Sequence, residues 1–469
     1  MFAYFKNLLL PLTTVTICSF FSCQKEFKDD NYTAYFGGEI VNPNNRYVLL
    51  LKDNEVIDSI LLDEKNRFLK KFDSLAPGMY TFKHEPEYQY IYFDKNDSLM
   101  IRLNTKEFDN SLVFCGRGDL KNNFLIEMFL KNEEDRNASF GLYDKDYKHF
   151  TKSIDSSYKV KKSFYLRRKT EIGWNENFDQ YAKAYLDLSH LAKKEIYPIA
   201  HKRRTGEDIC QKLPKDYYAY RKDINFNNEE LSTFVPFVRY LNALLNNYVY
   251  RDCDSEIQYE KQALEYNIQK LNIADTLIDN KKIKNAVLNN IAFMYLLEDQ
   301  NMANNKKFFD RYFQLSTDNS KHNEIKKISN AVQYLSPGNK LPKQDFINVF
   351  GEKIDFQHMV NGQTVVFFWT VSARSHFEGS HKKAMELKQE YPNLNFVAIN
   401  IDESKEKWEA TLNNYNFTST VEIHANDAQK LKDEWVITKI HRAILLNPDG
   451  TIKNAFISLF EPDFGSYLK

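Results

Sequence analysis

The chain has 469 residues, which is too long for one compact core and predicts two or three domains. Its 64 Lys and Arg residues balance 64 Asp and Glu residues, so the overall charge favours neither a nucleic-acid partner nor an acidic substrate. With 29 Tyr and 36 Phe but only 14 Gly and 12 Pro, the composition excludes a fibrous or low-complexity chain and predicts a folded, mixed α and β protein.

The first 22 residues resemble a bacterial lipoprotein signal peptide. One Lys precedes an apolar run from Leu8 to Phe21, and a small residue stands before Cys23. The run is short and contains Pro11, which argues against a permanent membrane-spanning helix. The resemblance implies cleavage before Cys23, lipid on its sulfur, and anchoring to a membrane of the bacterial cell envelope, on the periplasmic or the surface face of the outer membrane. An ordinary secretory signal is the alternative, and residues 23–31 follow as a polar tether.

Residues 32–117 predict a β-rich domain. Short runs of β-branched and aromatic residues, such as "RYVLLLKDN", "MYTFKHE" and "SLMIRLN", are separated by turn sequences such as "NPNN" and "APG". Strands of this length and spacing are typical of a β sandwich or barrel. We find no catalytic constellation in this part of the sequence.

Residues 118–335 predict an all-α region. Apolar residues recur at helical spacing in "VPFVRYLNALLNNYVY" and "KKIKNAVLNNIAFMYLLED". We expect the aromatic side chains on these faces to pack in a core and not to line a ligand site. The residues at this spacing are Phe237, Tyr240, Leu241, Leu244, Leu245 and Tyr248 in the first segment, and Ile283, Val287, Ile291 and Met294 in the second.

Residues 336–469 alternate strands and helices. "SPGNKLP" ends the helical region, and "KIDFQHM" and "TVVFFWT" read as strands before a helix near 375–391. A strand, "LNFVAINID", and a helix, "SKEKWEATLNNY", come next. "NPDGT" between two apolar runs predicts a hairpin near the end. The pattern predicts a βαβ unit joined to a strand hairpin.

This order of elements resembles a thioredoxin-like domain of the TlpA and peroxiredoxin-like branch. The resemblance is carried by "NKLPKQDFINVFGEKIDFQHMVNGQTVVFFW", "NFVAINID" and "AILLNPDGTIK". The β-rich part, with "FGGEIVNPN" and "NDSLMIRL", resembles the domain that often precedes such modules in exported bacterial lipoproteins. The fold class implied is α+β multidomain: a β sandwich or barrel, an all-α middle and a C-terminal thioredoxin-like α/β domain.

The sequence departs from this family where the family does its chemistry. Thiol exchange requires Cys-x-x-Cys at the turn from the central strand into the helix, and alignment on "FFW" puts Ala373 and His376 there. His441 takes the position of the family's cis-Pro, so we expect a trans bond. Phe367 replaces the buried acid of thioredoxin. We therefore expect a redox-inactive domain without catalytic residues, cofactor or metal.

The former active site is still the best candidate contact surface. We predict a binding or scaffolding role toward a protein or peptide of the envelope, with membrane contact through lipid at Cys23 and no nucleic acid. Ser375 suits the N-cap of the helix, and Arg374 with the helix N-terminus could bind an anion. The candidate groove contacts are Trp369, Ser372, Arg374, Ser375, His376, His441 and Arg442.

Two other classes of function stay open. The first is a thiol-disulfide oxidoreductase or peroxidase-like enzyme that uses a thiol outside the usual motif, namely Cys115, Cys210 or Cys253. The spacing of these three matches no metal motif, and sequence does not tell whether two of them pair. The second is a metal or hydrolytic site on His376 and His441, which would need a third ligand that the sequence does not place.

Overall fold

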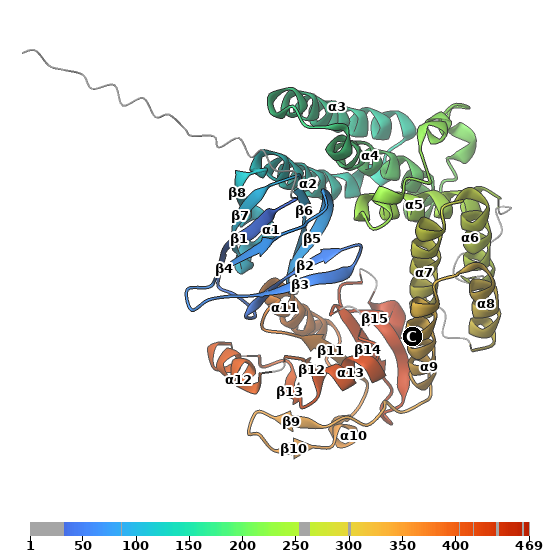
Figure 1. Cartoon of the computed structure of the whole chain (residues 1–469). Coiled ribbons are helices and arrows are strands. Elements are labelled where there is room, and N and C mark those ends of the chain that lie inside the picture. Colours follow the sequence, from blue (N-terminus) through green and yellow to red (C-terminus); the bar gives the residue numbers. More distant parts are fainter. Residues whose placement is uncertain are drawn as a thin grey trace, which may run out of the picture.

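The computed structural model describes residues 32–85, 87–252, 263–298, 302–402, 404–415, 417–437, 440–461 and 464–468. Cys23, Cys253 and the tether therefore lie outside the described residues. Figure 1 shows three parts: a β-rich part at the upper left, helices at the upper right and an α/β part below. The fold class predicted from the sequence is confirmed.

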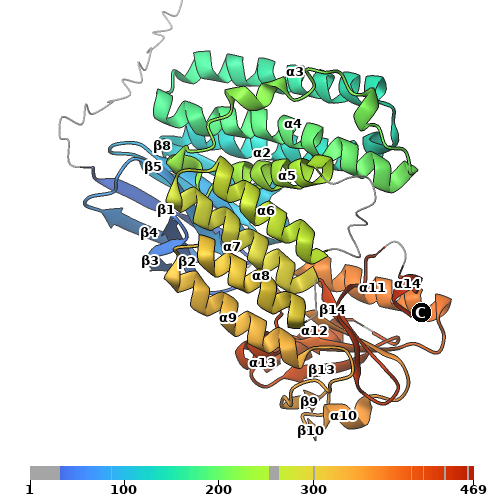
Figure 2. The same ribbon diagram turned by 90° about the vertical axis from the view of Figure 1, so that its right-hand side faces the viewer.

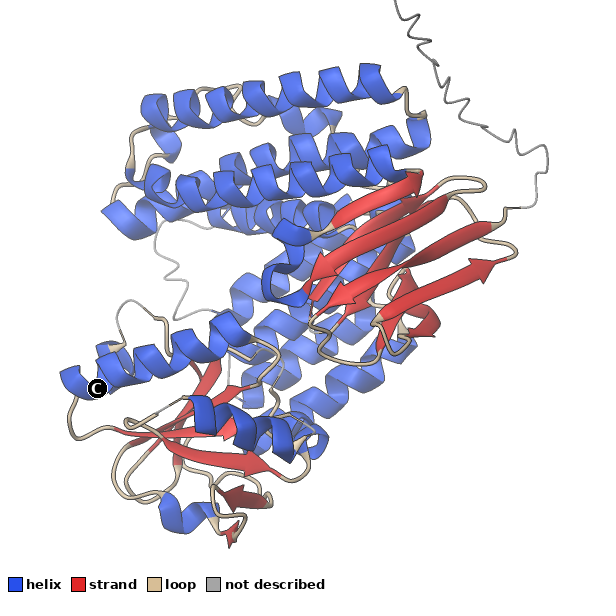
Figure 3. Cartoon of the chain, turned by 90° about the vertical axis from the view of Figure 1, so that its left-hand side faces the viewer, coloured by secondary structure: helices blue, strands red, loops and turns tan. Residues whose placement is uncertain are grey.

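The N-terminal part is a sandwich of two four-stranded sheets (Figure 3). One sheet has the order β4 (Arg67–Phe72), β1 (Ala34–Val41), β7 (Ser98–Asn104) and β8 (Val113–Arg117), with β1 and β7 parallel. The other has the order β3 (Glu55–Leu61), β2 (Tyr47–Lys52), β5 (Gly78–His84) and β6 (Glu87–Phe93), all antiparallel. A short helix, α1 (Phe108–Ser111), precedes β8.

The core of the sandwich follows from the alternation of side chains along its strands. In β7 the residues Leu99, Ile101 and Leu103 are buried, and their neighbours are not. In β6, by contrast, both faces are covered. Ile91 and Phe93 pack inside the sandwich, while Tyr90 and Tyr92 belong to the core of the helical region. The second sheet is therefore shared between the sandwich and the helices.

The middle of the chain is helical (Figure 2). Among its segments, α3 begins after Asp146, whose side chain accepts hydrogen bonds from two main-chain N–H groups, and α3 and α4 end at Gly173 and Gly206, both with left-handed φ. The helices are α2 (Asp119–Ser139), α3 (Tyr147–Ile172), α4 (Glu176–Thr205), α5 (Val235–Asp252), α6 (Ala263–Leu277), α7 (Lys281–Glu298), α8 (Met302–Leu315) and α9 (Asn319–Tyr334).

The two apolar stripes predicted from the sequence lie in α5 and α7, and most of their members are buried. Tyr248 and Met294 are half-buried. The buried members are Phe237, Tyr240, Leu241, Leu244 and Leu245 in α5, and Ile283, Val287 and Ile291 in α7. Core packing thus accounts for these aromatic and aliphatic faces.

The C-terminal part has a seven-stranded sheet in the order β10-β9-β13-β12-β11-β14-β15. The strands β11, β12 and β13 are parallel, and β14 is antiparallel to β11. The elements are β9 (Phe346–Asn348), β10 (Lys353–Ile354), α10 (Phe356–Met359), β11 (Thr364–Trp369), α11 (Arg374–Glu390), β12 (Asn395–Asn400), α12 (Lys405–Asn414), β13 (Val421–Ala425), α13 (Ala428–Glu434), β14 (Arg442–Leu446), β15 (Ile452–Ser458) and α14 (Gly465–Leu468).

Both faces of this sheet are covered. On one face, α11 and α12 contribute Phe377, Leu387 and Trp408 to a core with Phe367 of β11. On the other face, α13 packs together with α9 from the helical region. The predicted βαβ unit and the hairpin at "NPDGT" are confirmed by β11-α11-β12 and by β14 and β15.

One predicted strand is wrong in part. "KIDFQHM" forms only the two-residue β10 and then the helical turn α10. Asp355 causes the change, because its side chain accepts a hydrogen bond from the Gln357 N–H at 3.0 Å and caps the turn. Separately, none of the helices within the described ranges combines the length and apolar character needed to cross a membrane.

Candidate functional site

The candidate site is the turn from β11 into α11. Every residue of β11 is buried, so the strand is fixed at the centre of the sheet. The turn that follows is tied to the end of β12. The Val371 N–H donates to Asp402 Oδ2 at 2.8 Å, and the Thr370 hydroxyl donates to the same carboxylate. Asp402 therefore fixes the backbone at Thr370 and Val371, just before the candidate residues.

Ala373 is the N-cap of α11. Its carbonyl accepts the first helical hydrogen bond, from the Phe377 N–H at 3.0 Å, but its methyl group cannot cap the helix. The sequence placed the N-cap at Ser375, and this was wrong, because Ser375 already lies in the first turn of α11. The strand-to-helix turn thus ends at an apolar residue.

His376 lies in the first turn of α11. Its Nε2 is 3.2 Å from the Ser380 hydroxyl, and its Nδ1 is buried without a partner among the described atoms. Burial, and then the charges of His441 and His381, lower the pKa of His376 to about 4. The imidazole is therefore neutral at neutral pH.

His441 is exposed and lies just before β14. Its charge is one cause of the lowered pKa of His376, so the two side chains lie within electrostatic reach of each other. In the part of the chain that the structure describes, no three His, Cys, Asp or Glu side chains are arranged to hold a metal ion. The described residues therefore supply no third ligand for a metal ion bound by His376 and His441.

Arg374 and Ser372 are accessible. The Arg374 side chain is exposed, and its Nε donates to Glu378 Oε1 at 2.8 Å. The same oxygen accepts from the Tyr415 hydroxyl at 2.6 Å. The Ser372 hydroxyl is 3.0 Å from the Thr370 hydroxyl. The charge of Arg374 is already paired, which weakens the anion site predicted there.

Two predicted groove contacts are buried and are not accessible to a partner. Trp369 has 0% exposure and packs against Phe377 and His381, because alternate residues of β11 face the α11 side of the sheet. Arg442 has 6% exposure. Trp369 and Arg442 are therefore structural residues, and their prediction as contacts was wrong.

Arg442 caps the end of α13. Its guanidinium donates to the main-chain oxygens of Trp435 and Val436, and to that of Ala455 at 2.7 Å. It also lies over the Phe456 ring, 4.3 Å from the centroid. Burial lowers the pKa of Arg442 to about 9. A cation at the C-terminus of a helix is favourably placed.

Sequence reasoning missed a polar network at the carboxyl ends of the parallel strands. Asn400 donates to Asp402 Oδ2 at 2.7 Å and accepts from His424 Nδ1 at 2.9 Å, and His424 stacks on Trp408. Burial lowers the pKa of His424. Carboxyl ends of parallel strands are where open α/β sheets place ligands. The signal in the sequence was the pair of polar residues that ends "NFVAINID".

A buried pair of His381 and Glu422 was also missed. His381 Nδ1 is 2.6 Å from the Phe377 carbonyl, and its Nε2 is 3.2 Å from Glu422 Oε1. A carbonyl oxygen only accepts, so Nδ1 carries a proton, and the contact with Glu422 requires a second proton on the imidazole or on the carboxyl group. The charged residue inside the apolar run "TVEIHAN" was the available signal.

The described thiols lie outside this domain. Cys115 is exposed on β8 of the sandwich, and Cys210 is half-buried in a 3-10 turn, residues 210–212, of the helical region. Figures 1 and 2 both show β8 well apart from α11. The described thiols are therefore not part of the candidate site.

Residues 362–452 match the model of a family described as thioredoxin-like. Similar solved structures include a thioredoxin-like protein from Bacteroides caccae (16% identity over 51% of this chain and 86% of that chain, TM-score 0.35). The thioredoxin domain of a thiol-disulfide oxidoreductase from Bacteroides vulgatus is 17% identical over 25% of this chain and 86% of that chain, with a TM-score of 0.22. No curated protein matches the chain. The C-terminal domain is thioredoxin-like.

Proposed function

We propose that this chain is a lipid-anchored protein of the bacterial envelope whose thioredoxin-like domain binds a partner and does not exchange dithiols. The observation that carries the proposal is the start of α11, where Ala373 is the N-cap and His376 stands in the first turn. These are the two positions at which the reaction requires thiols, and neither side chain forms a disulfide.

The surface around the start of α11 offers contacts of mixed character. Ser372 and His441 supply hydrogen-bonding groups, and Arg374 is exposed beside Glu378. The Phe460 ring is 46% exposed and lies next to Gly379 of α11. Polar groups beside an accessible aromatic ring suit a protein or peptide partner. This supports a scaffolding role in which the domain presents a binding surface.

A second candidate is an oxidoreductase that uses a thiol outside the usual motif. The exposed thiol of Cys115 favours it, because thiol exchange needs an accessible sulfur.

One experiment distinguishes the binding role from the oxidoreductase. Disulfide-reductase activity is measured for the exported chain and for a variant in which Cys115, Cys210 and Cys253 are all changed to Ser. An Ala373→Cys/His376→Cys variant serves as the positive control, because it restores the missing motif.

A binding role predicts no reductase activity in the exported chain above that of the triple variant, with activity appearing only in the restored variant. Activity in the exported chain that disappears in the triple variant would overturn the proposal in favour of a relocated thiol. Activity that survives in the triple variant would point instead to chemistry without thiols at His376 and His441.

The anchor is tested separately. In cells, the unchanged chain is expected in the membrane fraction, and a Cys23→Ser variant in the soluble fraction. Membrane retention of Cys23→Ser after high-salt washing would contradict a lipid anchor at this residue and favour a different attachment.

A further inference from the structure

Helix α3 is the outermost element at one end of the molecule, and the described chain begins near the same end (Figures 1 and 2). The Lys95 ammonium is 4.8 Å from the centroid of the Tyr32 ring. Asn175, just after α3, donates to Asp94 at 3.3 Å. Asp94 and Lys95 both lie in the turn between β6 and β7. Tyr32, the first described residue, and Asn175, just after the C-terminal end of α3, therefore contact the same turn. The thioredoxin-like domain lies at the opposite end.

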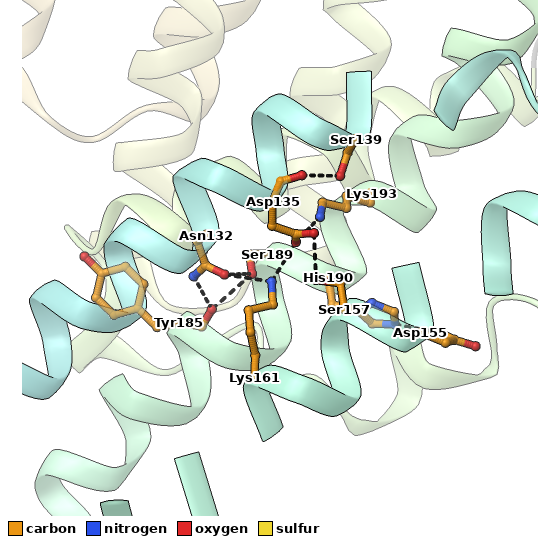
Figure 4. Close-up of polar contacts among 10 residues, drawn as sticks. All are labelled: Asn132, Asp135, Ser139, Asp155, Ser157, Lys161, Tyr185, Ser189, His190 and Lys193. Carbon is orange, nitrogen blue, oxygen red and sulfur yellow. Dashed lines mark hydrogen bonds and ion pairs between the residues drawn. The ribbon is translucent and has the colours of Figure 1, made fainter. Parts of the chain in front are cut away.

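The inner face of α3 is locked by a buried polar cluster (Figure 4). Lys161 of α3 donates to Asp135 of α2 at 2.7 Å and to Asn132 at 2.9 Å. Lys193 of α4 pairs with the same carboxylate, which also accepts from Ser157 at 2.7 Å. Burial acts to raise the pKa of Asp135, but the hydrogen bonds from the lysines and the serine outweigh it and bring the pKa to about 2. These contacts fix how α3 is rotated about its axis.

The outer face of α3 is basic and carries exposed apolar side chains. The helix has eight Lys and Arg residues against two acidic ones, in a chain whose net charge is zero. Val160 is 66% exposed and Leu166 is 52% exposed. At 100° per residue, one outward stripe with its two flanks contains Lys148, Lys152, Lys159, Val160, Lys162, Leu166 and Arg167. One acidic residue, Asp155, falls in the same sector; its side chain is 47% exposed and lies 3.5 Å from His190 Nε2, so the stripe keeps a net positive charge.

The inward and outward basic residues differ in their partners. Lys161 pairs with Asp135, Arg168 with Glu127 at 3.1 Å, and Lys169 with Asp179 at 2.8 Å. Within the described ranges, by contrast, the outward lysines of α3, at positions 148, 152, 159 and 162, make no ion pair. The Lys162 ammonium lies 5.9 Å from the centroid of the Tyr158 ring and its charge also acts on Asp187. The charges of Lys148, Lys152 and Lys159 form no ion pair within the described ranges, so they are available to a partner outside the chain.

We propose that the outer face of α3 lies against an anionic lipid surface. The placement rests on the proposed anchor at Cys23, since the nine tether residues reach at most ~30 Å from Tyr32. Basic side chains attract anionic headgroups, and exposed apolar residues among them enter the interfacial layer. Val160 and Leu166 take that role here. This contact turns the thioredoxin-like domain away from the bilayer.

The test uses the exported chain with Cys23→Ser, so that no acyl chain contributes. Binding to phosphatidylcholine vesicles, with and without phosphatidylglycerol, is measured by co-sedimentation. Lys152→Glu/Lys159→Glu/Lys162→Glu removes the outward charge. A matched control reverses three exposed lysines of the thioredoxin-like domain, at positions 343, 353 and 430. Far-UV circular dichroism and the thermal midpoint verify that all chains are folded, and the corresponding Lys→Gln variants provide a milder change.

We expect binding only to vesicles with phosphatidylglycerol, weakening as salt rises, with a loss of at least roughly tenfold for the α3 variant. The control variant should stay within about twofold, and the Gln variant should fall between. Equal loss in the control, or no binding to the anionic vesicles, would overturn the proposal. If vesicles fail while immobilised poly-glutamate captures the chain through the same lysines, the occupant is an acidic protein and the lipid assignment is wrong. None of these outcomes depends on the anchor, which the Cys23→Ser fractionation reports.

Discussion

The helical region and the thioredoxin-like domain bury their cations in opposite ways. In the helical region Lys161 and Lys193 share the carboxylate of Asp135, and Arg221 donates to Glu195 at 2.5 Å. In the thioredoxin-like domain Arg442 is buried as deeply, but it donates hydrogen bonds to the main-chain carbonyls of Trp435, Val436 and Ala455. The pKa of Asp135 falls to about 2 because its lysine and serine partners outweigh burial, whereas burial alone lowers the pKa of Arg442 to about 9.

The difference between paired and carbonyl-bound buried cations predicts where a substitution lowers the stability of the fold most. A buried ion pair adds little over an apolar pair, but loss of one member strands the other charge and is costly. A buried cation on carbonyl groups strands no opposite charge when it is removed. We therefore expect single substitutions to be worse tolerated in the α2–α3–α4 cluster than at Arg442.

The largest effect is expected for Asp135→Ala, which leaves Lys161 and Lys193 buried without a carboxylate. We expect the free energy of unfolding to fall by about 3–5 kcal/mol. Urea denaturation followed by far-UV circular dichroism measures the loss. Asp155→Ala is the matched control, because its carboxylate is 47% exposed and should cost about 0.5 kcal/mol or less. Similar losses in both variants would contradict the central role of the cluster.

Arg442→Met should have a smaller effect. It removes two hydrogen bonds to the end of α13 and one to Ala455 of β15, but it also removes a buried charge, so we expect a loss of about 1–3 kcal/mol in the same urea experiment. Arg374→Met, on an exposed arginine of the same domain, is the control and should leave the midpoint unchanged. A loss at Arg442 that exceeds the loss at Asp135 would reverse the comparison.

Neutral buried histidines and paired carboxylates should change the free energy of unfolding in different pH ranges. Burial, the largest cause, lowers the pKa of His190 and of His376 to about 4 each. Their ordinary value is ~6.5, so between these limits the unfolded chain binds more protons than the folded one. The free energy of unfolding should therefore fall as pH drops from 6.5 toward 4, by at most ~1.4 kcal/mol per pH unit for each histidine.

Asp135 acts in a different window. Its folded pKa of about 2 lies below the ordinary 3.8, so its contribution is complete above pH 4 and is lost as pH falls through 2. Denaturant midpoints at several pH values measure both windows. His190→Phe and His376→Phe should each flatten the slope between pH 6.5 and 4, and His358→Phe, on an exposed side chain, should not. An unchanged slope in the two buried variants would refute this account.

The smallest expected effect is an increase in stability. Ala373→Ser supplies a hydroxyl at the N-cap of α11, where the present residue makes no capping hydrogen bond. We expect about 1 kcal/mol of added stability, measured as a higher urea midpoint. Ala384→Ser, inside the same helix and fully buried, should destabilise instead. A destabilising Ala373→Ser would show that the cap is constrained by its surroundings.

Much of the fold could be predicted because periodicity reports burial locally. The stripe Tyr240, Leu241 and Leu244 in α5 repeats every turn, and the hairpin at Asp449 and Gly450 depends on turn residues alone. The strand-to-helix turn at Ala373 was placed by the same local signals, and His376 and His441 were brought together by the topology that these signals imply.

The rest of the site depends on contacts between segments far apart in the chain. Nothing near Thr370 reveals that Asp402, at the end of another strand, receives its hydrogen bond. Trp369 and Arg442 stand beside accessible residues in the sequence, but the direction of each side chain is set by its sheet position and by packing. Sequence adjacency to the candidate turn is therefore a poor guide to which side chains reach solvent.

Helix α9 belongs to two cores at once. Ile325 packs with the helical region, while Val332, two turns later, and the C-cap residue Leu335 pack under the sheet of the thioredoxin-like domain. Swivelling one domain against the other would expose these side chains to water, at a cost of about 1.5–3 kcal/mol for each. The helix therefore couples the two parts rigidly, and if both proposals hold, a partner bound beside α11 would be kept at a fixed distance from the lipid surface at α3.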